Sequence, residues 1–304
     1  MLKKNTSAII FLIIISLLLL AYFIYPKLAK TDADPWTMIP SETALILHTE
    51  SPKDFIDKIK SEEVLWQLLS KSSLITGLDI RLSAVADVLE SNTNYHNLLF
   101  NSPLSLAIQG DTTTNTANIL FLSKIQKSIS NNDLKAFLTK NLNGKYAVVD
   151  IVERKFGGLK ILDTENDQII YLYENHGVML ISNSLSFLTE SINTYKTNEA
   201  GIFNDNELIK VKNTAGKRVD ASLYINYPNL NRYLNKHITE NSINSLSALS
   251  NFASWTELDL IIKNEELLFS GFTAADSTKF LWNIKDDPAF TNKIYNLVPF
   301  NTNI

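Results

Sequence analysis

The carboxylates whose spacing most resembles that of a metal site lie between Asp163 and Glu174. Asp163, Glu165 and Asp167 alternate along the chain, and Glu174 follows eleven residues after Asp163. Alternate oxygen ligands closed by a distal carboxylate are typical of a calcium loop. However, Gln168 stands where that loop needs glycine, and both flanks have the pattern of strands instead of helices. We therefore interpret this segment as the acidic turn of a hairpin and predict no metal site.

Two further carboxylates, Glu257 and Asp259, lie two residues apart in a predicted strand, so their side chains point to the same face of the sheet. Paired carboxylic acids carry out the acid, base and nucleophile chemistry of glycoside hydrolases. Pairs at this spacing are also frequent on solvated strand faces, where they have no catalytic role. We predict no catalytic residue here, and a cell-envelope hydrolase that uses dispersed carboxylates is kept as the alternative function.

Histidines and glycine-rich motifs give no stronger signal. The four histidines, His48, His96, His176 and His237, are far apart, and none has a second ligand at the i+4 spacing of a helical metal site. His176 is expected in a turn. The chain also lacks a P-loop, a G-x-S-x-G nucleophile motif and a G-x-G-x-x-G dinucleotide motif. The sequence therefore predicts neither a metal ion nor a cofactor.

Aromatic residues are the remaining candidates for a binding role. Residues that could line a groove for a hydrophobic ligand are Trp66, Trp255, Trp282, Phe252 and Phe280. Aromatic side chains at helical or strand spacing more often belong to the core. One sequence does not distinguish which of the five face solvent.

The elements that must position these residues alternate in blocks along the chain. Strands are predicted at 44–49, 104–109, 117–123, 146–152, 159–162, 168–173, 178–182, 220–227, 255–263 and 267–274. Helices are predicted to begin near Pro52, Ser184 and Pro228 and to cover 64–69, 81–89, 133–142 and 239–252, while 196–217 is interpreted as a polar connection. This order predicts an α+β fold, with one or two antiparallel sheets and helices packed on one face.

The first 25 residues have the pattern of a membrane anchor. Residues 7–25 carry no charge, and a helix of that length spans about 28 Å at about 1.5 Å per residue, close to the hydrocarbon thickness of a bilayer. Tyr22, Phe23 and Tyr25 suit the headgroup level, and Pro26 stops the helix. A cleaved secretory signal is the competing interpretation, but the apolar stretch exceeds a usual signal core. We predict one retained transmembrane helix.

The absence of cysteine and the signal-like N-terminus favour a location outside the cytoplasm for the remainder. Residues 26–37 are predicted to be a linker and residues 38–304 an exported domain, with the N-terminus cytoplasmic and the domain periplasmic or extracellular. All 32 acidic residues follow Lys30, and 24 of the 28 basic residues do, which leaves a net charge of −8 (24 − 32). That charge repels phosphate and argues against nucleic acid. The absence of cysteine excludes disulfides, thiolate chemistry and a lipidated cysteine.

Three motifs behind the anchor suggest a family. They are DPWTMIP at 34–40, FGGLKI at 156–161 and HGVMLISNS at 176–184. Together with the anchor they resemble an uncharacterised bacterial membrane-anchored family, known only as a domain of unknown function and found often in Bacteroidetes-like bacteria. The resemblance covers about residues 34–304 and implies no activity and no catalytic residues.

The resemblance also bears on the length of the native protein. Family members tend to be about twice as long, and residues 297–303 echo residues 38–44. Both features suggest that the chain is an N-terminal portion of a longer, repeated protein. The expected function is a non-enzymatic binding or scaffolding module at the bacterial envelope, held by residues 7–25 in the lipid bilayer. Its partner, an envelope protein or a hydrophobic ligand, is not identified.

Overall fold

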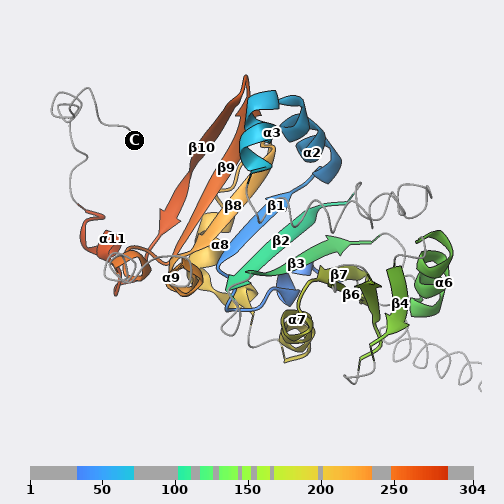
Figure 1. The fold of residues 1–304 in the computed structure, drawn as a ribbon. Coiled ribbons are helices and arrows are strands. Elements are labelled where there is room, and N and C mark those ends of the chain that lie inside the picture. The colour runs from blue at the N-terminus through green and yellow to red at the C-terminus, as the bar shows by residue number, and fades with distance from the viewer. Residues whose placement is uncertain are drawn as a thin grey trace, which may run out of the picture.

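The computed structural model describes residues 33–71, 102–110, 117–125, 130–142, 146–151, 156–164, 168–197, 201–234 and 248–286. Ten strands in these ranges form one antiparallel sheet in the order β10-β9-β8-β1-β2-β3-β7-β6-β5-β4 (Figure 1). The strands are β1 Leu45–Thr49, β2 Leu104–Gly110, β3 Ala117–Lys124, β4 Tyr146–Asp150, β5 Leu159–Asp163, β6 Ile169–Asn175, β7 Val178–Ser182, β8 Ala221–Asn226, β9 Trp255–Lys263 and β10 Glu266–Ala274. The α+β class and the large antiparallel sheet are confirmed.

The helices connect these strands in short blocks. They are η1 Pro35–Met38, α2 Pro52–Ser61, α3 Glu63–Leu69, α6 Asn131–Asn141, α7 Leu185–Thr197, η2 Ile202–Asn204, α8 Asn206–Lys212, α9 Tyr227–Leu234 and α11 Phe280–Asn283. Ser184 begins α7 as predicted, because its hydroxyl accepts a hydrogen bond from the Phe187 amide at 3.3 Å. The predicted helix at 81–89 and most of that at 239–252 lie outside the described residues.

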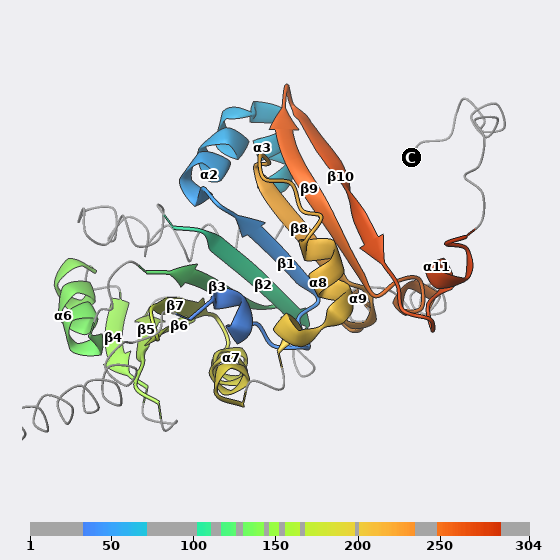
Figure 2. The ribbon, with the colours of Figure 1, turned by 180° about the vertical axis from the view of Figure 1, so that it is seen from behind.

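Helices cover both faces of the sheet, which corrects the prediction that they pack on one face. The reason lies in the central strands, which are apolar on both sides: all five residues of β7 are buried. Leu180 of β7 clusters with Phe187 of α7 and Leu208 of α8. The adjacent Ile181 points to the opposite face, where it clusters with Leu138 of α6. Figures 1 and 2 show α2 and α3 on one side of the sheet and α8 on the other.

A third cluster lies on the same face as α6 and fixes the α2–α3 pair over β8 and β9. Its buried members are Leu65, Ala221, Leu260 and Ile262, with Leu47, Phe55, Ile59 and Leu267 packed against them. Strand β1 joins the two halves of the sheet, because it pairs with β8 on one edge and with β2 on the other. The first strand of the described residues is therefore a central strand of the sheet.

The described chain is already packed into the core at its first residues. Ala33 and Trp36 are buried at 6% and 5% exposure, and the Ala33 amide donates to the His176 carbonyl at 2.9 Å. Residues 33–37, assigned above to the linker, thus belong to the folded domain. The predicted anchor at 7–25 lies outside the described residues, and within those residues no helix is long and apolar enough to cross a membrane.

Candidate binding surface

Exposed apolar side chains gather at one end of the sheet. Among the described residues, eight of the thirteen large apolar side chains that are exposed lie between residues 252 and 284. They are Phe252, Ile261, Leu268, Phe269, Phe272, Phe280, Trp282 and Ile284. We call this surface, formed by β10, α11 and the adjoining parts of β9 and the preceding loop, the apolar end. Leu268 and Phe272 lie on one face of β10 and Phe269 on the other, while the rings of Phe252 and Phe280 stack on each other. Exposed apolar side chains that gather on a folded domain often mark an interaction site.

The β9–β10 hairpin is built on a tight turn that is held in place by α3. Asn264 and Glu265 form the turn with φ of 52° and 60°, the left-handed conformation of a two-residue hairpin loop. The Glu265 carboxylate accepts from the amides of Val64 and Leu65 at 3.2 and 3.3 Å, which caps the first turn of α3. In return, the Glu265 amide donates to the Glu62 carboxylate at 2.7 Å. The tip of the hairpin is therefore fixed by reciprocal contacts.

Strand β10 ends the sheet and is long and apolar for an edge strand. Within the described part of the chain it pairs only with β9, over all nine residues. Leu268, Phe269 and Phe272 are about half exposed, at 47%, 51% and 48%. Natural edge strands are usually protected by lysine, proline or bulges. β10 has none of these, and Glu266 is its sole charged residue.

Gly271 brings β10 unusually close to β9. A Cβ atom at this position would lie 1.8 Å from the main-chain oxygen of Glu257, so no other residue fits without movement of the backbone. The glycine also leaves a gap between Phe269 and Thr273, its neighbours on the same face of β10. A gap of this kind is a place where another backbone or an aromatic ring can approach.

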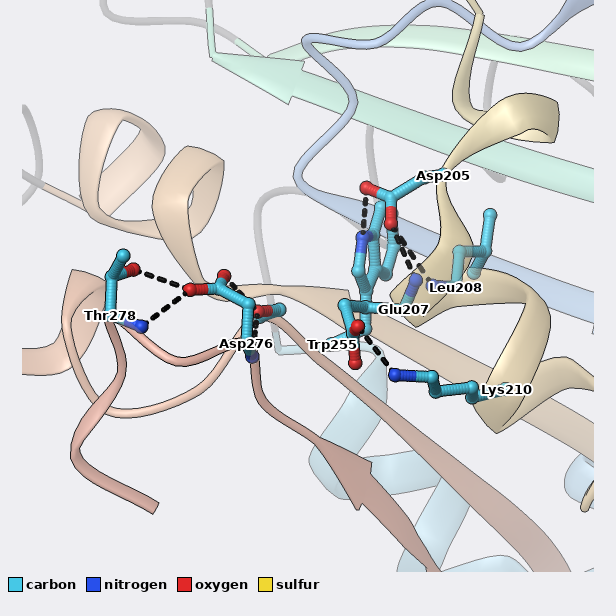
Figure 3. Close-up of polar contacts among 8 residues, drawn as sticks. Asp205, Glu207, Leu208, Lys210, Trp255, Asp276 and Thr278 are labelled. Carbon is cyan, nitrogen blue, oxygen red and sulfur yellow. Dashed lines mark hydrogen bonds and ion pairs between the residues drawn. The ribbon is translucent and has the colours of Figure 1, made fainter. Parts of the chain in front are cut away.

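The loop after β10 is ordered by Asp276. Its carboxylate accepts from the Thr278 amide at 2.8 Å, from the Thr278 hydroxyl and from the Ser254 hydroxyl at 2.8 Å (Figure 3). The hydrogen bonds from Thr278 are the main reason why the pKa of Asp276 is lowered to about 2. The Phe280 amide then donates to the Asn251 carbonyl at 2.8 Å, which attaches α11 to the loop before β9.

Helix α8 packs against β9 and β10 and so supports the apolar end. Asp205 caps this helix, since one of its oxygens accepts from the amides of Glu207 and Leu208 at 2.9 and 3.2 Å. Its other oxygen accepts from the indole nitrogen of buried Trp255 at 2.9 Å, which ties α8 to β9 (Figure 3). Helix α8 lies in the stretch interpreted above as a polar connection. The signal for it was Asp205 followed by Leu208 and Val211 at helical spacing.

The two acids on β9 differ in exposure, since Glu257 is enclosed and Asp259 is partly exposed. Glu257 is 0% exposed, and its carboxyl group lies beside the side chains of Asp259 and Ser222. Burial, followed by the neighbouring Asp259 carboxylate, raises the pKa of Glu257 to about 7. Asp259 itself accepts from the Gly216 amide at 2.8 Å. A polysaccharide has no access to Glu257 in this arrangement, so the pair is not set up as a glycosidase site.

The other candidates are dispersed. His48 contacts the Ser105 hydroxyl at 2.9 Å and the Glu50 carboxylate at 3.3 Å, and burial lowers its pKa. His176 lies in the β6–β7 turn with φ of 49°, which confirms the predicted turn, while His96 and His237 lie outside the described residues.

The acidic segment is flanked by strands β5 and β6, as expected for a hairpin. Asp163 ends β5, and Glu174 in β6 accepts from the Gly177 amide at 2.8 Å, whereas Glu165 and Asp167 lie outside the described residues. Across the described ranges, no group of three or more histidine or acidic side chains is arranged to hold a metal ion.

The five aromatic candidates divide between core and surface. Trp255 is in the core at 1% exposure, and Trp66 on α3 is half-buried with the Lys60 ammonium 5.6 Å from its ring. Phe252, Phe280 and Trp282 all lie at the apolar end, where the rings of Phe252 and Phe280 stack with centroids 6.3 Å apart. The structure thus distinguishes the exposed aromatic residues from the buried ones.

Comparisons with known proteins add no assignment. The chain matches no family model, no curated protein and no solved structure.

Proposed function

We propose that the chain is a membrane-anchored module, exported to the periplasmic or extracellular side of a bacterial cell, that binds or scaffolds another envelope component through its apolar end. The observation that carries this proposal is the concentration of eight exposed apolar side chains between residues 252 and 284. Membership of the bacterial membrane-anchored family and the anchor at 7–25 are parts of the same proposal.

The support beneath the apolar end favours a binding role. A binding surface loses less entropy when its supporting elements are already fixed. Here the hairpin tip is held by α3 through Glu265, α8 is held to β9 through Asp205, and the loop before α11 is held by Asp276. Exposed aromatic rings on such a frame are typical anchors of protein interfaces.

The hydrolase alternative receives less support. Glu257 has the raised pKa of a catalytic acid, but its side chain is fully buried. His48 and Glu50 form a contact between histidine and carboxylate, yet the Glu50 side chain is 76% exposed and lies on the solvent side of the histidine. A catalytic base is normally oriented by a positioned, less exposed partner.

The binding role is tested with the full chain in native envelope membranes. A photo-crosslinking amino acid replaces Trp282 at the apolar end or Val149, an exposed residue of edge strand β4 at the opposite end of the sheet. We expect one discrete adduct with a different protein from position 282 and none from position 149. Phe280→Asp should suppress the adduct without lowering the melting temperature. Equal labelling at both positions would contradict the proposal.

Export and anchoring need a separate measurement. A reporter enzyme that is active only outside the cytoplasm, fused after residue 304, should be active. The fusion should stay in the membrane pellet after a carbonate wash. Release of the intact chain by carbonate, or an inactive reporter, would refute the anchored and exported part of the proposal.

A further inference from the structure

We infer that β10 is a self-association site, at which it pairs antiparallel with β10 of a second copy about a two-fold axis at Ser270. The inference rests on the proposed binding role of the apolar end and names the occupant of its strand edge. It concerns β10 alone and assigns no occupant to α11 or Phe252. Its basis is the order of residues along β10, which is complementary to itself.

The first argument concerns the backbone groups that face outward. In a hairpin with a two-residue turn, the residues that flank the turn exchange both hydrogen bonds, and hydrogen-bonded and non-hydrogen-bonded pairs then alternate. Lys263 pairs with Glu266 in this position, and the register continues without interruption to Ala274. The amide and carbonyl groups of every second residue of β10 therefore point away from β9. These residues are Leu267, Phe269, Gly271 and Thr273.

The second argument concerns the register. When the two-fold axis lies at Ser270, Phe269 faces Gly271 of the second copy, and Leu267 faces Thr273 of the second copy. All four of these residues carry outward-facing groups, so each becomes part of a hydrogen-bonded pair. Ser270 faces its own copy as a non-hydrogen-bonded pair, which is consistent with its groups being directed at β9. This register uses the whole strand, and any shifted two-fold axis leaves residues unpaired.

The third argument concerns side chains and charge. On one face, Leu268 lies opposite Phe272 of the second copy. The two-fold symmetry creates this pair twice, and each pair covers two exposed apolar side chains. On the other face, the Phe269 ring lies over the gap at Gly271 of the second copy. Glu266 lies opposite Ala274, and the two Glu266 carboxylates are about 27 Å apart at about 3.4 Å per residue. No like charges meet across the pair.

The arrangement is also compatible with one shared membrane. The two-fold axis of a continuous antiparallel sheet is perpendicular to the sheet, so each face of one copy is continuous with the same face of the other. The face of the sheet that carries η1 and buried Trp36 is therefore on one side of the dimer in both copies. Residue 33 of each copy consequently lies on the same side of the dimer.

Cysteine cross-linking tests the pairing, because the natural chain has no cysteine. Ser270→Cys places two thiols in a non-hydrogen-bonded pair with Cα atoms about 4.5 Å apart, within the range of a disulfide. In the purified full chain in detergent, mild oxidation should convert most of this variant to a covalent dimer on a non-reducing gel. Leu268→Cys alone should cross-link poorly, since the two copies of position 268 are about 14 Å apart. A mixture of Leu268→Cys and Phe272→Cys should cross-link well.

Two controls make the result specific. Val149→Cys is exposed on the other edge strand and should give only the background of random collisions. Adding Leu268→Lys and Phe272→Lys to Ser270→Cys should reduce the dimer at least tenfold, with an unchanged far-ultraviolet spectrum. The inference is overturned if Ser270→Cys cross-links no better than Val149→Cys, or if Leu268→Cys alone cross-links as well as the mixture. Neither a membrane nor another partner is needed, so this outcome is independent of the adduct at position 282.

Discussion

Replacing Glu257 with glutamine should remove a pH dependence of stability that the fold builds into β9. The buried carboxyl keeps its proton in the folded state up to a pH of about 7, whereas its ordinary pKa is 4.5. Between these values the folded chain binds one more proton than the unfolded chain. The stability that protonated Glu257 contributes is therefore fully present below pH 4.5 and is lost as pH rises to about 7. At about 1.4 kcal/mol per pH unit, the loss amounts to about 3 kcal/mol.

The assay compares the natural chain with Glu257→Gln by urea unfolding of the full protein in detergent at several pH values. Glutamine has nearly the same shape and does not titrate, so the variant should gain stability relative to the natural chain by about 3 kcal/mol between pH 4.5 and 8. Any constant cost of the buried amide cancels, because only the change with pH is diagnostic. Glu266→Gln on exposed β10 is the matched control, for which a difference within about 0.5 kcal/mol is expected.

Two results would refute this reasoning. A difference between the natural chain and Glu257→Gln that does not vary with pH would show that the folded and unfolded states bind the same number of protons at this site. A difference of the opposite sign would show that the carboxylate is stabilised in the fold, which the complete burial of its side chain argues against. The test presumes a two-state transition, which is checked by coincidence of fluorescence and circular dichroism.

Three further predictions concern the support of the apolar end. Asp205→Ala should cost about 1 kcal/mol for the lost cap and a further 1–3 kcal/mol for the unpaired Trp255 indole, measured by chemical denaturation, whereas Asp205→Asn should recover part of the loss. Gly271→Ala should destabilise the hairpin by about 1–3 kcal/mol because its Cβ has no room, while Ser270→Ala should change the melting temperature little. Because the pKa of Asp276 is lowered from 3.8 to about 2, its stabilising contribution should be present above pH 3.8 and lost as pH falls through 2, and Asp276→Asn should abolish this acid dependence.

The strands were predictable because each is a short β-rich run with a clear turn signal at its ends. The meander β4 to β7 is an example: each of its four strands was predicted to within two residues. Helix α8 was missed because only seven residues form it and most of them are polar. Its stability comes from the Asp205 cap and from burial of Leu208 and Val211 against the sheet, and such tertiary contacts outweigh the weak local signal.

The order of the strands could not be read in the same way. β1 pairs with β8, although Ile46 and its partner Tyr224 are far apart in the sequence. A two-residue period indicates that the side chains of a strand alternate between faces, but it does not indicate which distant strand pairs with it. The burial of Glu257 has the same origin. Its spacing from Asp259 was plain, whereas its enclosure depends on the partner strands and on α8.

The contrast between β7 and β10 shows why position in the sheet determines what an apolar strand does. β7 reads VMLIS and is buried throughout, because it has a strand on each side and helices on both faces. β10 reads ELLFSGFTA, in which five of the nine residues are apolar, yet most of it is exposed because it is the last strand. Burying one large apolar side chain stabilises the folded state by about 1.5–3 kcal/mol. An exposed β10 therefore lacks a stabilisation that β7 has. A second copy supplies that cover without changing the fold, which is why the cross-link at Ser270 is the decisive measurement for the apolar end.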